Sequence, residues 1–182
     1  GEYAKQTDFV PLPPNPAAEI EAEMKRIRES TGKTRPGVLR QSMQQTMMEN
    51  VSVFRHESGM KDALDVVREL KERYRNDITI DDKGYKFNTD LLEAWELGCL
   101  LDLAEATTIS AMTRTESRGG HSRDDYKQRD DANWLVHTLV TANDAAGPYG
   151  STTIEPEINL KKKVDLSLSE HDERFKPKER VY

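Results

Sequence analysis

Cysteine is almost absent from this chain, since its 182 residues include only Cys99. A lone cysteine cannot form a disulfide within the chain, so we expect a reducing compartment. No apolar run approaches the roughly 20 residues that a membrane-spanning helix needs. The N-terminus also lacks the pattern of a secretory signal peptide. We therefore expect no direct insertion of this chain into a membrane.

Positive charge is outweighed by negative charge, and the formal net charge is −6. Binding to phosphate backbones depends on clustered lysine and arginine, so nucleic acid is not an expected partner. Hydrophobic residues make up 35% of the chain and charged residues 33%. The core must therefore be thin relative to the surface, which favours a helical bundle over a sheet sandwich. The length suits one small domain with appendages.

Four segments carry apolar residues at helical spacing. A proline-rich lead precedes them, and Asn15 and Pro16 suit the cap and first position of the first helix. Ser58 suits the cap of the third helix. The first predicted helix is residues 17–32, with apolar residues Ile20, Met24 and Ile27, and the second begins at Pro36, with Leu39, Met43 and Met47. The third begins at Ser58, with Met60, Leu64, Val67, Leu70 and Tyr74. The fourth is residues 89–114, with Leu92, Trp95, Cys99, Leu103, Ala106, Ile109 and Met112.

Beyond the helices the apolar pattern alternates with a period of two. The segments "NWLVHTLV" (133–140) and "TIEPEINL" (153–160) predict a β-ribbon joined by "TANDAAGPYGS", with Pro156 confining its strand to an edge. The highly charged tail after residue 160 should be mobile in isolation. The predicted fold is mainly α, an up-and-down bundle of three to four helices like a spectrin repeat, followed by an extended or β-ribbon C-terminal segment. The predicted divisions are an extended lead (1–16), the bundle (17–118) and the C-terminal extension (119–182).

The segment "RTESRGGHSRDDYKQRDDANW" (114–134) concentrates charges of both signs. Ser117, His121 and Asp125 are the residue types of a hydrolytic triad, but no G-x-S-x-G turn positions the serine. A metal site would draw on the histidine and on Asp124, Asp125, Asp130 and Asp131. The interleaved arginines would oppose a cation, and no Cys-x-x-Cys or His-x-x-x-His spacing occurs. The acidic turn "DDKGYKFNTD" places its glycine and acids at the wrong offsets for a calcium loop.

A latch is the interpretation that this segment favours, with a solvated charged loop as the alternative. Arg114 and Arg118 are spaced one helical turn apart, Gly119 and Gly120 would end the helix, and arginines then alternate with carboxylates. Arginine binds carboxylates through a planar fork, so the segment can hold a chain reversal against a neighbouring domain. The predicted latch residues are Arg114, Glu116, Ser117, Arg118, Gly119, His121, Arg123, Asp125, Tyr126, Arg129, Asp130, Asp131 and Trp134.

These residues resemble the C-terminal signature of the flavoprotein subunits of succinate dehydrogenase and fumarate reductase. The run Glu116–His121 is shared with the related L-aspartate oxidases, whereas the continuation from Arg123 to Trp134 is closer to succinate dehydrogenase and fumarate reductase. Further similarities are "SVFR" (52–55), "FNTDLLEAWELG" (87–98) and the terminal "KPKERVY". Lys127 departs from the proline that many members have. The last residues are most similar to an actinobacterial succinate dehydrogenase.

The resemblance implies a parent protein that binds FAD, oxidises succinate to fumarate and passes electrons to an iron-sulfur subunit and quinone. The family's flavin and dicarboxylate sites precede the matched region, and no G-x-G-x-x-G occurs in this chain. We therefore expect no catalytic, cofactor-binding or metal-binding residue here and no activity of the chain alone. The implied partners are the flavin-binding and capping domains of the same subunit and the iron-sulfur subunit. The implied location is the cytoplasmic side of the cell membrane, reached through partner subunits.

Two alternatives remain open at this point. The chain could be a free-standing helical interaction module, or the C-terminal domain of a fumarate reductase or an L-aspartate oxidase. Its start at "GEYAKQ", without a methionine, favours a segment of a longer protein. Apolar surface that a parent domain would cover could also bring two copies of the chain together.

Overall fold

The structure is a computed structural model that describes residues 1–141, 157–159, 164–176 and 178. It confirms the mainly α fold. The helices are α1 (Glu2–Gln6), α2 (Ala18–Arg28), α3 (Pro36–Asn50), α4 (Glu57–Asn76), α5 (Thr89–Thr113), α6 (Asp131–Trp134), α7 (Ser167–His171) and the 3-10 helix η2 (Glu173–Phe175). The strands are β1 (Phe54–Arg55), β2 (Ser122–Arg123), β3 (Leu139–Thr141) and β4 (Glu157–Asn159).

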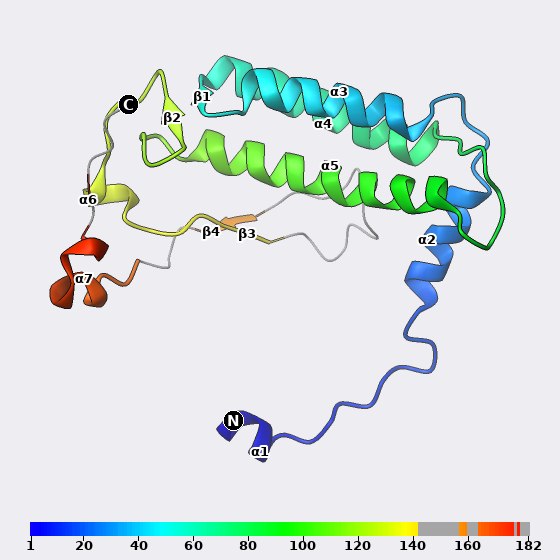
Figure 1. Cartoon of the computed structure of the whole chain (residues 1–182), viewed down its shortest axis with the longest axis horizontal. Helices are drawn as coiled ribbons and strands as arrows, with labels where there is room; N and C mark the ends of the chain where they lie inside the picture. The colour runs from blue at the N-terminus through cyan, green and yellow to red at the C-terminus, as the bar shows by residue number, and fades with distance from the viewer. Residues whose placement is uncertain (142–156, 160–163, 177, 179–182) are drawn as a thin grey trace.

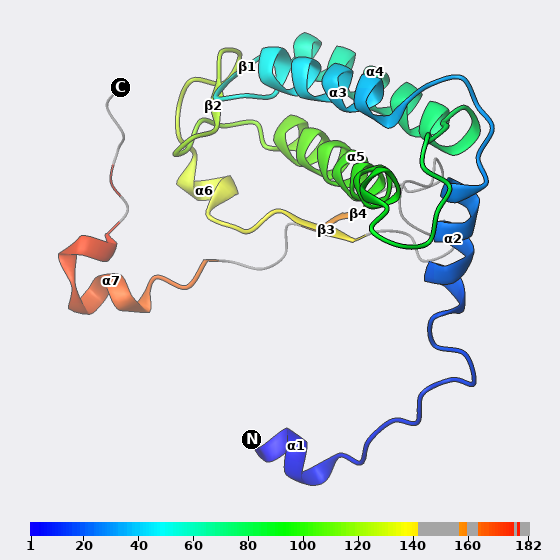
Figure 2. The same ribbon diagram turned by 45° about the vertical axis from the view of Figure 1, so that its right-hand side comes forward.

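Three long helices, α3, α4 and α5, form the body of the molecule. They run alternately in opposite directions along nearly one axis, and each of them contacts the other two (Figures 1 and 2). The shorter α2 lies across the end of this bundle where α5 begins, and the N-terminal lead extends away from it (Figure 1). The opposite end of the bundle carries β1, β2 and α6, so the chain following α5 is folded against that end.

Helix starts follow local capping chemistry. Pro36 occupies the first turn of α3, where its missing N–H costs no hydrogen bond. At α5 the Asn88 side chain accepts from the Leu91 amide at 2.7 Å. Two predicted caps were wrong. His56, and not Ser58, caps α4 by accepting from the Ser58 amide through its imidazole, and α2 begins only at Ala18 because residues 15–18 form a separate turn.

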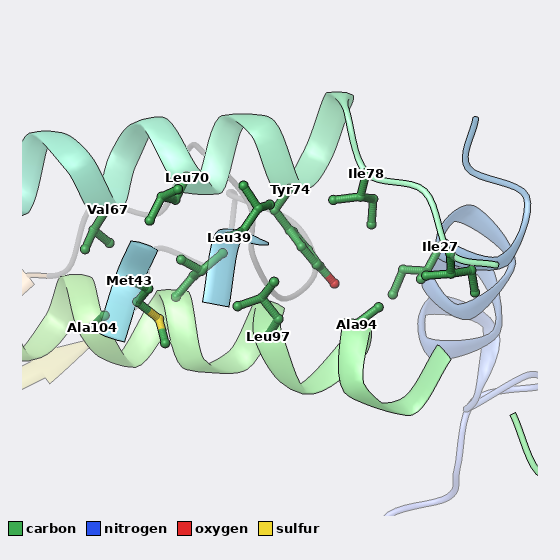
Figure 3. Close-up of a cluster of buried hydrophobic side chains, with 12 residues drawn as sticks. Ile27, Leu39, Met43, Val67, Leu70, Tyr74, Ile78, Ala94, Leu97 and Ala104 are labelled. Carbon is green, nitrogen blue, oxygen red and sulfur yellow. The ribbon is translucent and has the colours of Figure 1, made fainter. Parts of the chain in front are cut away.

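The core lies between the three long helices and the C-terminal end of α2 (Figure 3). The spacing of apolar residues predicted this face correctly for the second and third helices and for Ile27, which is fully buried. Ile20, by contrast, is exposed, because α2 touches the bundle mainly through its C-terminal turns. The buried positions that the sequence predicted are Ile27, Leu39, Met43, Met60, Val67, Leu70 and Tyr74, whereas Met24, Met47 and Leu64 are half-buried.

The apolar positions noted on α5 in the sequence are not the ones that it buries in the bundle. Leu92 and Leu103 are 52% and 63% exposed, and the other predicted positions on this helix are half-buried. The helix is apolar on most of its circumference, so hydrophobic spacing alone does not choose a face. The buried face combines two leucines with small residues that let α3 and α4 approach closely: Ala94, Leu97, Gly98, Leu101, Ala104, Thr108 and Ala111. Leu92 and Leu103 are left on the outer side of the helix.

The predicted β-ribbon is present in part. Strand β3 pairs antiparallel with β4, with Val140 opposite Ile158, and the ribbon lies beside α5 (Figures 1 and 2). Trp134 lies in helix α6 and not in a strand, because Asp130 caps a short helix there. Most of the joining segment and Pro156 lie outside the described residues. The lead contains the helix α1, whereas the sequence predicted an extended lead throughout.

A parallel pair of short strands joins the connection between α3 and α4 to the segment that follows α5. Strand β1 pairs with β2 in the register Phe54 to Ser122 and Arg55 to Arg123. The chain between α3 and α4 therefore lies directly beside the chain that follows α5. The alternation of apolar and polar residues in the sequence did not predict this pairing of two distant segments.

Gly98→Ala is expected to destabilise the fold. A Cβ at this position of α5 would lie 2.8 Å from the Tyr74 hydroxyl and 2.9 Å from its Cζ, and Tyr74 is fully buried. Overpacking of this kind costs about 1–3 kcal/mol. Urea denaturation followed by circular dichroism measures the change, and Gly37→Ala in α3 is the matched control because nothing lies within 4 Å of its Cβ. Equal stability of the two variants would contradict the close α4–α5 packing.

Candidate functional site

The residues singled out by the sequence gather at the C-terminal end of α5, in a segment that we call the arginine loop (residues 114–134). The helix stops at Thr113, because Arg114 adopts extended backbone angles. Arg118 and His121 exchange backbone hydrogen bonds of 2.8 and 3.0 Å across a tight turn, in which Gly119 has a φ of +58° that favours glycine. The predicted bounds of this helix, 89–114, are confirmed to within one residue, whereas the expectation that Gly119 and Gly120 end it was wrong.

Arg123 holds the end of α5. Its side chain is completely buried, and Nη1 donates to the carbonyls of Ala111, Met112 and Arg114 at 3.1, 2.9 and 3.3 Å. The remaining nitrogens donate to both carboxylate oxygens of Asp125 at 2.7 Å. These hydrogen bonds lower the pKa of Asp125 to about 2. One guanidinium thus satisfies the terminal carbonyls of the helix and is itself neutralised.

Glu116 is the central carboxylate of the arginine loop and is also fully buried. It accepts from Arg118 Nε at 2.8 Å, from Arg118 Nη2 at 3.1 Å and from the Asp130 amide at 2.8 Å, and Arg114 Nη1 also donates to it. Burial alone would raise the pKa of Glu116, but these hydrogen bonds hold it below the ordinary value. Glu116 therefore joins both halves of the loop as a charged side chain.

The outer part of the loop is a second set of ion pairs. Arg118 Nη2 donates to Asp131 at 2.6 Å, and Arg129 donates to both oxygens of Asp131 at 2.8 Å. Hydrogen bonds from Arg129 and Arg118 lower the pKa of Asp131 to about 2. Asp130 caps α6 by accepting from the Asn133 amide at 3.1 Å. Arg129 also donates to the Lys178 carbonyl at 3.1 Å, which connects the loop to the C-terminal tail.

The smaller side chains hold the backbone of the loop. The Ser117 hydroxyl accepts from the Arg123 amide at 2.8 Å and donates to the Tyr126 carbonyl at 2.8 Å. The guanidinium of Arg114 lies 5.1 Å from the centre of the Trp134 ring, and that of Arg123 lies 4.9 Å from the Tyr126 ring. Such cation–π contacts add about 0.5–2 kcal/mol each, depending on exposure. Ser117, Tyr126 and Trp134 are therefore structural members of the loop.

The geometry offers no hydrolytic triad. Ser117 bonds to backbone groups and Asp125 to Arg123, while both ring nitrogens of His121 bond elsewhere. The base that would activate the serine therefore has no hydrogen bond to it. Across the described part of the chain, no group of histidine, cysteine, aspartate and glutamate side chains is arranged to hold a metal ion.

His121 is fixed from both sides. Arg55 Nη1 lies 2.6 Å from Nδ1 of the imidazole, and Nε2 lies 3.1 Å from the Arg114 carbonyl. Because a guanidinium only donates, Nδ1 must accept and Nε2 must carry the proton. Burial lowers the pKa of His121, and the nearby Arg55 and Arg123 lower it further. The imidazole is therefore held neutral.

The fold is expected to lose stability as the pH falls through the titration of His121. Its folded pKa lies below that of an unfolded histidine, about 6.5, so the unfolded state binds the proton more readily. The stabilisation is complete above about pH 6.5 and is lost below it. Urea midpoints at about pH 7.5, 6.5 and 5.5 measure the slope, and His121→Gln should flatten it because glutamine can make both hydrogen bonds without titrating. Identical slopes for the two proteins would contradict this assignment.

Arg55 also belongs to this site, although the charge pattern of residues 114–134 did not predict it. It comes from β1, and the pairing of β1 with β2 brings it to the loop. Glu57 contributes from the same connection, since its amide donates to Asp125 at 3.2 Å. The signal for Arg55 was the "SVFR" similarity at residues 52–55, which gave no partner for it, and Glu57 lies outside that match.

The chain is similar to known proteins in both sequence and structure. The family profile described as "Fumarate reductase flavoprotein C-term" matches residues 40–182. The succinate dehydrogenase flavoprotein subunit of Coxiella burnetii is 45% identical over 118 residues, which cover 65% of this chain and 20% of that protein. The fumarate reductase flavoprotein subunit of Haemophilus influenzae is 37% identical over 154 residues, which cover 81% of this chain and 26% of that protein.

A solved structure of the same kind of enzyme is also similar to this chain. A quinol-fumarate reductase with menaquinol molecules superposes with a TM-score of 0.73 at 33% identity, covering 89% of this chain and 27% of the matched chain. The chain thus spans about a quarter of the length of the relatives that it matches.

Proposed function

This chain belongs to the family of C-terminal domains of succinate dehydrogenase and fumarate reductase flavoprotein subunits, and we propose that it is the part of such a subunit that supports the catalytic domains without taking part in the reaction. The proposed whole protein interconverts succinate and fumarate using FAD, in the succinate-oxidising direction, and exchanges electrons with an iron-sulfur subunit and quinone. The observation that carries the proposal is the match of residues 40–182 to the model of the C-terminal domain. Fumarate reduction is the alternative direction, because a fumarate reductase subunit is similar over 81% of the chain.

FAD would be held by the rest of such a subunit and not by these residues. A flavin-binding domain places the pyrophosphate on a glycine-rich turn between a parallel strand and a helix N-terminus. Helix α4 follows the parallel strand β1, but its first turn carries Glu57, whose charge would repel a phosphate. The cofactor's proposed contribution is to accept hydride, and the chain's own contribution is to shape the subunit around the domain that holds it.

The proposed role of the arginine loop is that of a latch. Its carboxylates and arginines are paired within the loop, and Arg123 and Arg129 connect it to α5 and to the C-terminal tail. These contacts would fix the direction in which the chain leaves the bundle, and hence where the C-terminal extension lies in the subunit. The division into bundle (17–118) and extension (119–182) belongs to the same proposal.

The proposed partners follow from the exposed outer side of α5. Leu92 and Leu103 are exposed there, and a domain packed on this side would remove both side chains from water. We assign it to the flavin-binding and capping domains of the same subunit, with a second copy of the chain as the alternative for the isolated domain. Contact with an iron-sulfur subunit through the extension and location at the cytoplasmic face of the membrane are part of the proposal. Within the described ranges, no helix has both the length and the apolar character to cross a bilayer.

A flavin titration of the purified 182-residue chain tests the catalytic part of the proposal. We expect no saturable change in flavin fluorescence and no succinate-dependent dye reduction, because the chain lacks a glycine-rich phosphate loop. A full-length flavoprotein subunit of a succinate dehydrogenase serves as the positive control in both assays. Stoichiometric flavin binding or measurable turnover by the chain alone would refute its assignment as a supporting domain.

A further inference from the structure

A pocket of about 360 Å³ opens beside the C-terminal half of α5, next to the arginine loop. Its polar lining includes Arg55, Arg114 and His121, and its apolar lining includes Leu103 and Ala106. Thr138, from the segment between α6 and β3, also lines it. The pocket is therefore formed by three separate stretches of the chain that the arginine loop holds together, and it combines cationic groups with an apolar wall. We call it the Arg55 pocket.

The charge of Arg55 is uncompensated, unlike that of its neighbours. Arg114, Arg118, Arg123 and Arg129 each form an ion pair with a carboxylate. Arg55 instead donates from Nε to the carbonyls of Val51 and Ser52 at 3.1 and 2.6 Å, and from Nη1 to His121. Among the described residues, it has no carboxylate within ion-pairing distance.

The surroundings of Arg55 increase the cost of this unpaired charge. The side chain is half-buried, and burial together with the nearby Arg123 lowers its pKa. His121 supplies no negative charge, since it is neutral and presents only a lone pair to the guanidinium. Arg114, the other cation on the pocket wall, forms an ion pair with Glu116, which also pairs with Arg118. Arg55 is therefore the cation at the pocket wall that has no carboxylate partner among the described residues, and an anion in the pocket would supply one.

We propose that the Arg55 pocket binds a carboxylate attached to a small apolar body, with the carboxylate on the Arg55 guanidinium and the body against Leu103 and Ala106. A carboxylate matches the planar guanidinium fork and carries the single negative charge that the site lacks. A volume of about 360 Å³ lies at the small end of ligand pockets, which suits a short carbon chain. The carboxylate can come from a free small molecule or from a glutamate side chain of a polypeptide packed on this face.

Two probes distinguish these sources. Butyrate represents the free carboxylate, and N-acetyl-glutamate α-amide represents a glutamate side chain within a polypeptide. Each is titrated into the 182-residue chain at neutral pH while NMR follows the Arg55 Nε–H and His121 ring signals. We expect saturable shifts with a dissociation constant on the order of 1 mM, as befits a ligand of few atoms.

Two variants assign the binding to the pocket. Arg55→Gln removes the charge and retains an N–H donor towards His121, and it should weaken binding at least tenfold. Ala106→Phe fills the apolar side and leaves Arg55 in place, so it should abolish binding even if the first variant folds poorly. Arg35→Gln is the control, because Arg35 is exposed and pairs with Asp81 elsewhere, and it should bind as the unaltered chain does.

Each outcome decides the proposal. Binding of butyrate alone would support a free carboxylate as the ligand, and binding of the amide alone would support a glutamate side chain. Binding of both would support a pocket open to either source. Shifts that persist unchanged in Ala106→Phe, or no saturable shift with either probe, would overturn the proposal.

Discussion

Glu116→Gln is expected to lower the free energy of unfolding of the chain by about 3–5 kcal/mol, the range for breaking a buried ion pair by changing one partner. The substitution keeps the size of the side chain but removes the charge that Arg114 and Arg118 share. It also replaces an acceptor oxygen with an NH2 group that must face an arginine or the Asp130 amide. Both effects act at a fully buried position.

Urea denaturation at pH 7 measures the loss, and hydrogen exchange at the Asp130 amide reports it locally. That amide donates to Glu116, so it should lose protection in the variant more than the amides in the middle of α4. Glu49→Gln is the matched control, since Glu49 is an exposed glutamate that accepts only from Gln45 at 3.0 Å. A cost below about 0.5 kcal/mol, the usual range for surface positions, would show that Glu116 does not hold the loop.

Lys71→Met should cost a similar amount, about 3–5 kcal/mol, through a buried charge between α4 and α5. Lys71 is 1% exposed and its ammonium lies 2.8 Å from Asp102 and 2.7 Å from Glu105, which is itself 3% exposed. Removing the lysine leaves the Glu105 carboxylate buried with Arg68 as its remaining ion-pair partner, at 2.9 Å. The loss should appear in the urea midpoint at pH 7.

The double variant Lys71→Met/Glu105→Leu separates the two contributions. Replacing both members of a buried pair by apolar residues is often neutral or stabilising, so the double variant should recover most of the stability. Lys61→Met on the same helix is the control, because Lys61 and Glu57 form an exposed pair at 2.7 Å, which solvent screens, so its loss should change the stability little. A double variant no more stable than the single one would mean that packing, and not the unpaired charge, dominates.

The sequence predicted the helices better than it predicted which faces are buried. Leu39, Met43 and Val67 stand among polar neighbours at helical spacing, so the pattern identifies their face and the structure confirms it. On α5 apolar residues occur on most sides, so the choice of face depends on how closely the neighbouring helices approach. That approach is made possible by Gly98 and the alanines, and a hydrophobic pattern gives small residues little weight.

The buried ion pairs could not be predicted from the sequence either, because they depend on how the elements pack. Lys71 and Glu105 occupy positions that a sequence pattern assigns to solvent, and only the register of α4 against α5 makes them partners. In the arginine loop the residue types indicated ion pairing, but the pairing scheme depends on where the helix stops. Arg55 reaches the loop through the pairing of β1 with β2, which joins residues far apart in the chain and leaves no local signal.

The way α5 ends has a consequence for how the molecule opens. The helix has no basic residue in its own last turn, and its terminal carbonyls depend on the guanidinium of Arg123. The final turn and residues 114–125 should therefore open together, as one cooperative unit in native-state exchange. A chain shortened to residue 118 would lose this guanidinium and fray back along α5, so the shortest stable form of the bundle extends past Asp125.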